Sequence, residues 1–157
     1  MDRKELTGML IADCEGIELV AKKDKFGVIN IGYGLAQKYL DGSPICEGDV
    51  CTEEQAMQWL QEYCEINVYP RIDSWIPNFN VTDRMYASLC AFDYNVGMLG
   101  ISLISALRHD DMNELKEAFL KYDKVRNSDG ELEFCQGLKN RRMKEINFFM
   151  NEDGSLK

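Results

Sequence analysis

Two acidic residues near the N-terminus have the type and spacing that could support catalysis. Glu15 stands just before Gly16 at the end of an amphipathic segment, and Asp24 follows nine residues later in a lysine-rich turn. Two carboxyl groups that flank a scissile glycosidic bond are the usual equipment of enzymes that hydrolyse glycosides. The pair therefore raises the hypothesis of a glycosidase site.

The expected position of Glu15 at the C-terminal end of a helix suits a general acid. The negative end of the helix dipole disfavours a carboxylate there and favours the protonated form, which can protonate a leaving-group oxygen. A surface glutamate at a frayed helix end is the alternative. Asp24 also has a structural alternative, because aspartate is a common first residue of a type I turn.

Polar and glycine residues beyond Asp24 extend the candidate site. Asn30 interrupts an apolar strand, where asparagine is disfavoured. Its amide could hold a catalytic water beside Asp24, or it could bond only to neighbouring backbone. Tyr33 and Gly34 belong to a glycine-rich segment that lets the backbone turn sharply or approach another group closely, and we assign both to substrate binding.

Two later segments supply further candidates for substrate binding. Asn95 follows Tyr94 at the expected end of a buried helix, where these side chains could line a sugar site or close a turn. Arg142 belongs to a basic cluster that opens the last helix. The cluster could bind a peptide or lactyl carboxylate, or pair with acids of the protein's own fold; it consists of Lys139, Arg141, Arg142 and Lys144.

A helix and a hairpin must position the two carboxylates. The spacing of Asp2 and Glu5 is that of a capping box, and it predicts a first helix that ends near 15–16, with Gly16 in the left-handed αL conformation. Apolar runs at 17–21 and 26–31, separated by a charged turn, predict a β-hairpin.

The rest of the chain is predicted to be mostly helical. A loop at 41–51 precedes a second capping box, Thr52 with Gln55, which begins a helix expected to end before Pro70. A helix capped by Asn80 or Thr82 should follow and end near 95–97. The remaining expected elements are helices at 101–107, 112–122 and 138–150, with a loop at 127–130 before the last helix.

These elements indicate an α+β fold with two lobes in a single domain, 1–157. We define the hairpin lobe as residues 13–60, which carry the candidate catalytic side chains. The helical lobe comprises 1–12 and 61–157. A cleft between such lobes is where a ligand site is expected.

Composition argues against several other classes of protein. The formal net charge of −9 argues against a nucleic-acid partner, which requires a basic face. Six cysteines lack a CxxC pair and have only His109 as a nitrogen ligand, so we expect no metal site. We expect free thiols, although a Cys46–Cys51 bridge would close a plausible loop. His109 lies in a polar stretch and is expected to be exposed.

The N-terminal residues form only a short amphipathic stretch, without the apolar region and cleavage site of a secretory signal. No segment approaches the eighteen apolar residues that a spanning helix needs. We therefore expect synthesis in the cytoplasm, with outside help for any work beyond the membrane.

Taken in order, these residues resemble the phage-type lysozymes, the bacteriophage endolysins of glycoside hydrolase family 24. Nearly the whole chain takes part in the resemblance. It rests on Glu15-Gly16 with Asp24 and Gly27, on Ile31-Gly32-Tyr33-Gly34, on Thr52-Glu53-Glu54-Gln55-Ala56, on the helix end at 89–97, and on Gly137-Leu138 with Arg141-Arg142 and Glu145.

The resemblance implies a muramidase that hydrolyses the β-1,4 bond between N-acetylmuramic acid and N-acetylglucosamine in peptidoglycan. Glu15 would protonate the glycosidic oxygen while Asp24 activates or positions water on the opposite face of the sugar, with inversion and without a cofactor. Because the chain lacks a secretory signal, we expect accumulation in the host cytoplasm, release through a holin-type lesion and action in the periplasm or cell wall. We also expect a monomer.

Two positions depart from the family pattern. Asn30 stands where the family commonly has threonine, and Leu35 stands where histidine is frequent. Either change could lower activity or alter its pH dependence. A lytic transglycosylase and a non-catalytic glycan-binding homologue therefore remain alternative functions, and a delivered antibacterial toxin would share the same chemistry.

Overall fold

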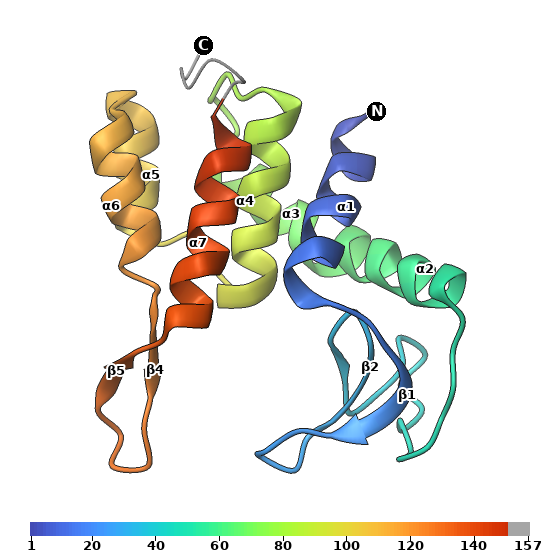
Figure 1. Cartoon of the computed structure of the whole chain (residues 1–157). Helices are drawn as coiled ribbons and strands as arrows, with labels where there is room; N and C mark the ends of the chain where they lie inside the picture. The colour runs from blue at the N-terminus through green and yellow to red at the C-terminus, as the bar shows by residue number, and fades with distance from the viewer. Residues whose placement is uncertain (151–157) are drawn as a thin grey trace.

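The computed structural model describes residues 1–150 and shows the expected α+β architecture (Figure 1). In chain order the elements are α1 (Arg3–Glu15), β1 (Glu18–Lys23), β2 (Ile29–Gly32), β3 (Leu35–Ala36), α2 (Glu53–Tyr63), the π-helical segment η1 (Cys64–Val68), α3 (Tyr69–Trp75), α4 (Asp83–Val96), α5 (Ile101–His109), α6 (Met112–Leu120), β4 (Lys124–Arg126), β5 (Leu132–Phe134) and α7 (Gln136–Phe149).

Helix α1 begins as its capping box predicts and ends at the expected residue. The Asp2 carboxylate accepts hydrogen bonds from the backbone of Lys4 and Glu5, and the Glu5 carboxylate accepts one from the Asp2 backbone. The prediction that Gly16 is in the αL conformation is wrong. Its φ of 67° is combined with an extended ψ of 176°. Only glycine adopts this combination readily, and it directs the chain into β1.

The predicted hairpin is confirmed, and the structure adds a third strand to it. Strands β1, β2 and β3 form an antiparallel sheet in that order, with Lys22 opposite Asn30 and Ile31 opposite Leu35. This sheet has a small core of its own, into which Trp59 of α2 packs from the helical side. The fully buried members of that core are Ala21, Ile31 and Ile45.

The helix that begins after Thr52 ends at Tyr63, before Pro70 as predicted, but the chain does not leave the helical path there. Helix α2 begins at the Thr52–Gln55 capping box, but η1 and α3 continue the helical path to Trp75. The Tyr69 backbone N–H donates to the Cys64 carbonyl, the wide hydrogen-bonding pattern of a π-helix. Pro70 then falls in the first turn of α3, where a missing N–H costs little.

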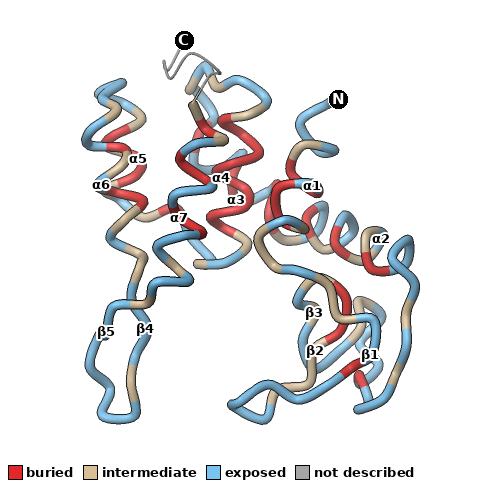
Figure 2. Tube along the Cα trace, in the orientation of Figure 1, coloured by how far each residue is buried: buried red, intermediate tan, exposed pale blue. Residues whose placement is uncertain are grey.

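Helix α4 is the centre of the helical lobe. It begins at the Thr82 cap and ends at Gly97, whose φ of 87° is left-handed, as its place at the helix end suggests. Residues 85–93 are all buried, because α1, α3, α6 and α7 gather around one large core (Figure 2). Side chains of α4 that face the sheet are therefore carried by a well-packed helix.

A second hairpin replaces the simple loop expected around 127–130. Strands β4 and β5 pair antiparallel, and the Asn127 side-chain oxygen accepts from the backbone of Asp129 and Glu131 in the turn. Each strand has only three residues, all exposed, so no alternating buried pattern marks them in the sequence. Figure 1 shows this hairpin extending below α7, in the same direction as the β1–β2 hairpin.

The structure describes all six cysteines, and each is a free thiol. His109 is exposed, as predicted, and pairs with Glu114. Within residues 1–150 no helix combines the length and apolar character needed to cross a membrane. The exact boundaries of the two lobes stay a prediction, and the end of the predicted domain, 151–157, lies outside the described residues.

Candidate active site

Glu15 lies at the end of α1 and is held there by an arginine from the last helix. The Nη1 atom of Arg141 is 2.6 Å from Glu15 Oε1, and the two side chains are 9% and 22% exposed. The Arg141 guanidinium also donates to the Ala91 carbonyl of α4 and to Glu145 of α7. The ion pair and these further bonds fix the Glu15 side chain at the end of α1.

Gly34 brings the β2–β3 turn against the Glu15 carboxyl group. Its φ is +91°, and a Cβ added there would lie 3.6 Å from Glu15 Oε2 and 3.8 Å from Tyr94 Oη. The Tyr94 hydroxyl donates to the Tyr33 carbonyl at 2.7 Å, which ties the same turn to α4. The close backbone approach expected from the glycine-rich segment is therefore present, and the group approached is the candidate acid.

Asp24 lies at the end of β1 and is fully exposed. Its Oδ1 accepts hydrogen bonds from the backbone N–H groups of Val28 at 3.0 Å and Phe26 at 2.8 Å. These bonds, Val28 foremost, lower the pKa of Asp24 below its ordinary value of 3.8. Asp24 therefore stabilises the turn that contains it, as the structural interpretation predicted. It is also ionised at neutral pH.

Asn30 lies beside Asp24 on the neighbouring strand and is half-buried. Its Nδ2 donates to the Val28 carbonyl at 2.9 Å, so the amide is satisfied by nearby backbone. Its side chain also helps to lower the pKa of the Asp24 carboxyl, after the backbone bonds from Val28 and Phe26. The bond to neighbouring backbone that we predicted is therefore present, and the side chain also acts on Asp24. Its predicted role in holding a catalytic water stays a prediction.

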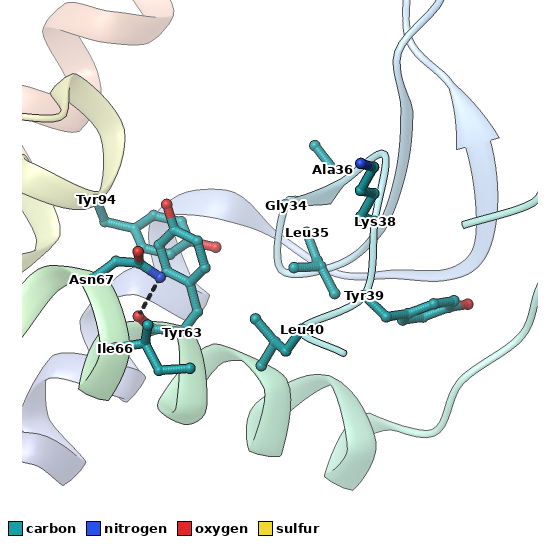
Figure 3. Close-up of a pocket in the computed structure, with 10 residues that line it drawn as sticks. All are labelled: Gly34, Leu35, Ala36, Lys38, Tyr39, Leu40, Tyr63, Ile66, Asn67 and Tyr94. Carbon is teal, nitrogen blue, oxygen red and sulfur yellow. Dashed lines mark hydrogen bonds between the residues drawn. The ribbon is translucent and has the colours of Figure 1, made fainter. Parts of the chain in front are cut away.

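A pocket of about 340 Å³ lies between the two lobes, next to Gly34 (Figure 3). One wall comes from the sheet lobe and the other from α2, η1 and α4. The rings of Tyr63 and Tyr94 meet edge to face, with centroids 5.4 Å apart, and Asn67 donates to the Tyr63 carbonyl. Apolar and tyrosine side chains with a few polar groups are typical of ligand sites; the wall from the sheet lobe includes Leu35, Lys38, Tyr39 and Leu40.

Comparison with known families assigns this architecture. The family model described as phage lysozyme matches residues 12–145, which is most of the chain and includes both candidate carboxylates. The chain belongs to the phage lysozyme family. It is therefore a glycoside hydrolase of the lysozyme type, as the resemblance implied.

Solved structures agree with the family assignment. The endolysin from Escherichia coli O157:H7 phage FAHEc1 is 28% identical, with 100% of this chain and 98% of that chain covered and a TM-score of 0.82. A mutant of P22 lysozyme is 23% identical, with coverage of 91% and 94% and a TM-score of 0.71. The active form of the P1 phage endolysin Lyz is 18% identical, with coverage of 93% and 86% and a TM-score of 0.67.

The last two likenesses show a shared fold and nothing finer. Comparison with curated protein sequences gives no match.

In this phage lysozyme, the substrate contact predicted for Arg142 is wrong. Arg142 is fully buried, pairs with Glu145 through Nε at 3.1 Å, and lies over the Phe92 ring with 4.8 Å to the ring centroid. Its Nη2 donates to Asn95 Oδ1 at 2.6 Å. A buried guanidinium cannot reach a glycan strand, so the second interpretation of the basic cluster, pairing with acids of the fold, holds for Arg142.

The other predicted substrate residues divide into two groups. Gly34 lines the pocket, and Tyr33 adjoins it through the bond from Tyr94. Asn95 is exposed, but its side-chain oxygen Oδ1 accepts a hydrogen bond from Arg142, so its substrate contact stays a prediction. No cluster of three histidine, cysteine or acidic side chains suited to a metal is found in the described part of the chain.

Sequence reasoning missed part of the pocket wall. Tyr63, Ile66 and Asn67 line it from the junction of α2 and η1. Their positions depend on the wide π-helical turn, for which the sequence carries no recognisable signal. The ion pair between Arg141 and Glu15 agrees with one of the two interpretations of the basic cluster, in which its members pair with acids of the protein's own fold.

Proposed function

We propose that this lysozyme hydrolyses the β-1,4 bond between N-acetylmuramic acid and N-acetylglucosamine in peptidoglycan, with Glu15 as general acid and Asp24 as the partner carboxylate. The observation that carries the proposal is the placement of the Glu15 carboxyl group beside Gly34, at the edge of the pocket between the lobes. The family assignment supports the reaction class, and the geometry supports the roles proposed for the two residues.

The two oxygens of Glu15 have different surroundings, which suits proton donation. Oε1 accepts from Arg141, whereas Oε2 is the oxygen next to Gly34 and Tyr94. A proton on Oε2 would therefore be the one that reaches a glycosidic oxygen bound at the pocket edge. Once the proton has left, Arg141 faces the new carboxylate charge at 2.6 Å and stabilises it.

Asp24 would act as the base on the opposite face of the sugar. Its lowered pKa keeps it ionised, as required of a group that activates water. The backbone N–H groups of Phe26 and Val28 orient this carboxylate, and Asn30 helps to keep it ionised. In such an inverting reaction water attacks the anomeric carbon from the face opposite the departing oxygen, so the β-linked substrate gives an α-configured product.

The Glu15→Gln variant tests the acid. It keeps the size and hydrogen bonding of the side chain but carries no acidic proton, so clearing of purified peptidoglycan should fall by about 10²- to 10⁴-fold. Circular dichroism would verify the fold, and sedimentation with peptidoglycan would verify binding. Equal clearing by the variant would refute the role of Glu15; equal inertness of both proteins, with binding retained, would favour the non-catalytic homologue.

Product analysis separates hydrolysis from transglycosylation. Digested peptidoglycan should contain reducing N-acetylmuramic acid ends, first formed as the α-anomer, which proton NMR of the fresh digest detects. A 1,6-anhydro end would instead identify a lytic transglycosylase, and an initial β-anomer would contradict inversion. Loss of activity in Asp24→Asn, with substrate binding unchanged, is expected under the hydrolytic mechanism.

Release through a holin-type lesion, action in the periplasm or cell wall, and a monomeric state remain proposals. Gel filtration tests the monomeric state. Expression in bacteria with and without a pore-forming protein tests the release, since lysis of the cells should require that protein.

A further inference from the structure

The pocket between the lobes contains one cation. Among the residues that line it, all within the described chain, Lys38 alone has a basic side chain and none has an acidic one. Lys38 lies on the wall from the sheet lobe, across the pocket from Tyr63 and Asn67 (Figure 3). No acid within residues 1–150 forms an ion pair with Lys38. Its exposed ammonium group is therefore available to an anion that enters the pocket.

Other cations near the candidate carboxylates are already engaged. Lys22 and Lys23 of β1 pair with exposed glutamates. On α7, Arg141 holds the candidate acid and Arg142 is fully buried. Residues 41–70, which supply α2 and η1 of the facing wall, contain no lysine or arginine. A substrate carboxylate in the pocket would therefore have Lys38 as its cation.

An uncommon turn fixes the backbone at Lys38. The Lys38 N–H donates to the Ala36 carbonyl at 2.7 Å, and Gln37 between them has a φ of 64°. Such a bond across a single residue of positive φ is typical of the strained kind of γ-turn. The Gln37 N–H donates to Ile29 and its carbonyl accepts from Ile45, both at 2.9 Å, so two flanking segments hold the turn. Strain of this kind is concentrated at ligand sites.

The proposed substrate carries carboxylates on only one of its two sugars. N-acetylmuramic acid bears a lactyl group, whose carboxyl group is either free or extended by the peptide stem, and the stem has carboxylates of its own. N-acetylglucosamine has no carboxylate. A cation at a fixed place in the pocket can therefore distinguish the two sugars, because an ammonium group forms charge-assisted hydrogen bonds with a carboxylate.

We propose that Lys38 binds a carboxylate of the peptidoglycan strand, on the lactyl group or the peptide stem, and so selects N-acetylmuramic acid as the sugar that occupies the pocket. The inference rests on the proposed hydrolysis of peptidoglycan and adds a residue that determines specificity. Gly34 borders both this pocket and the Glu15 carboxyl group. Selection of the sugar in the pocket therefore sets which glycosidic bond meets the acid.

Three variants separate charge from shape. Lys38→Gln removes the cation and keeps a polar side chain, whereas Lys38→Arg keeps the charge. Lys121→Gln is the matched control, because Lys121 is an exposed lysine at the end of α6, outside the pocket, and donates to the Ser102 hydroxyl. Each change is combined with Glu15→Gln, so that bound fragments are not hydrolysed, and calorimetry gives the Kd.

Three kinds of soluble glycan fragment distinguish the sources of the carboxylate. They are peptidoglycan fragments with peptide stems, the same fragments after an amidase has removed the stems and freed the lactyl carboxylate, and neutral chitin oligosaccharides. Lys38→Gln should weaken binding of anionic fragments by about two- to fivefold, the range of an exposed ion pair, and leave chitin binding unchanged. Weakening with peptide-bearing fragments alone identifies the stem carboxylate, and weakening after amidase treatment identifies the lactyl carboxylate. Lys38→Arg and Lys121→Gln should bind all three as the parent does.

Kinetics in the otherwise unchanged chain supply a second readout. Lys38→Gln should raise the KM for peptidoglycan by the same factor and leave kcat nearly unchanged, because the carboxylate contact is equal in the ground state and the transition state. If the unchanged chain does not hydrolyse peptidoglycan, the proposed function fails, while the contrast in Kd still decides the role of Lys38.

Three results would overturn the inference. Equal weakening of chitin oligosaccharides would show that Lys38 only shapes the pocket. An unchanged Kd for both anionic fragments would show that no carboxylate binds there. The same weakening in Lys121→Gln would show that the net charge of the protein, and not the position of Lys38, determines binding.

Discussion

At the scale of single residues, the sequence indicated the local settings of the two candidate carboxylates but not which basic side chain pairs with Glu15. Glu15 and Asp24 occupy a helix end and a hairpin turn, as their local sequences indicate. Arg141 and Arg142 are neighbours in sequence, yet a helix turns about 100° per residue, so one meets Glu15 and the other is buried over Phe92. Only the rotation of α7 against α4 distinguishes them, and local sequence does not contain it.

Gly34→Ala tests whether the acid needs the close approach of the β2–β3 turn. The positive φ should cost about 1 kcal/mol or more of stability, and the added methyl would crowd Glu15 Oε2 and Tyr94 Oη. Gly48→Ala is the matched control, since Gly48 has φ +92° with nothing within 4 Å of the added Cβ. Urea unfolding should show similar losses for both, whereas peptidoglycan clearing should fall only for Gly34→Ala; an equal fall in both would contradict crowding.

The hydrogen bonds to Asp24 link its ionisation to stability. Because its pKa is lower in the folded chain than the ordinary 3.8, its contribution is fully present above that value and is lost as pH falls through the folded pKa. NMR of the Asp24 carboxyl carbon should therefore give a midpoint below 3.8, and a midpoint above it would contradict the turn geometry. Asp24→Asn should also remove this part of the acid dependence of stability.

At the scale of elements, capping residues were the most dependable signals. The boxes at Asp2 and Thr52 and the cap at Thr82 all begin helices in the structure. What the sequence could not show is how helices join. Pro70 suggested a helix end, but the wide turn of η1 accommodates it, and the short exposed strands β4 and β5 were below the length at which alternation is visible.

Thr82→Ala tests the cap that begins α4. The Thr82 hydroxyl oxygen accepts from the Met85 backbone at 3.2 Å, and its removal should cost about 1 kcal/mol in the free energy of unfolding. Thr82→Ser keeps the acceptor and should retain most of the stability. Denaturant titrations measure both, and an alanine variant as stable as the wild type would show that packing alone sets the start of α4.

At the scale of the whole molecule, one large core in the helical lobe and a small one in the sheet lobe pack the described residues, and no disulfide joins them. The six cysteines are free and differ widely in access: Cys46 is exposed, whereas Cys64 and Cys90 are buried in the large core. Burial raises the pKa of Cys64 to about 12 and also raises that of Cys90. A buried neutral thiol is a poor nucleophile, so the two should react only when the helical lobe opens.

Thiol labelling tests this arrangement. A maleimide should modify Cys46 first, while Cys64 and Cys90 should react together and at a rate that follows global unfolding in urea. A reducing agent should leave the thermal midpoint unchanged, since no disulfide is present to break. Rapid labelling of Cys64 in the native protein, or a lowered midpoint on reduction, would contradict the described core.

The contact between Glu15 and Arg141 joins residues 126 positions apart, on the first and last helices. During synthesis, α1 and the sheet leave the ribosome long before α7 does. A nascent chain therefore contains Glu15, the proposed acid, before Arg141 has been added to hold it. A product truncated before residue 141 would lack this ion pair permanently. Contacts this distant in sequence also form late in folding, so completion of the active site should coincide with completion of the fold.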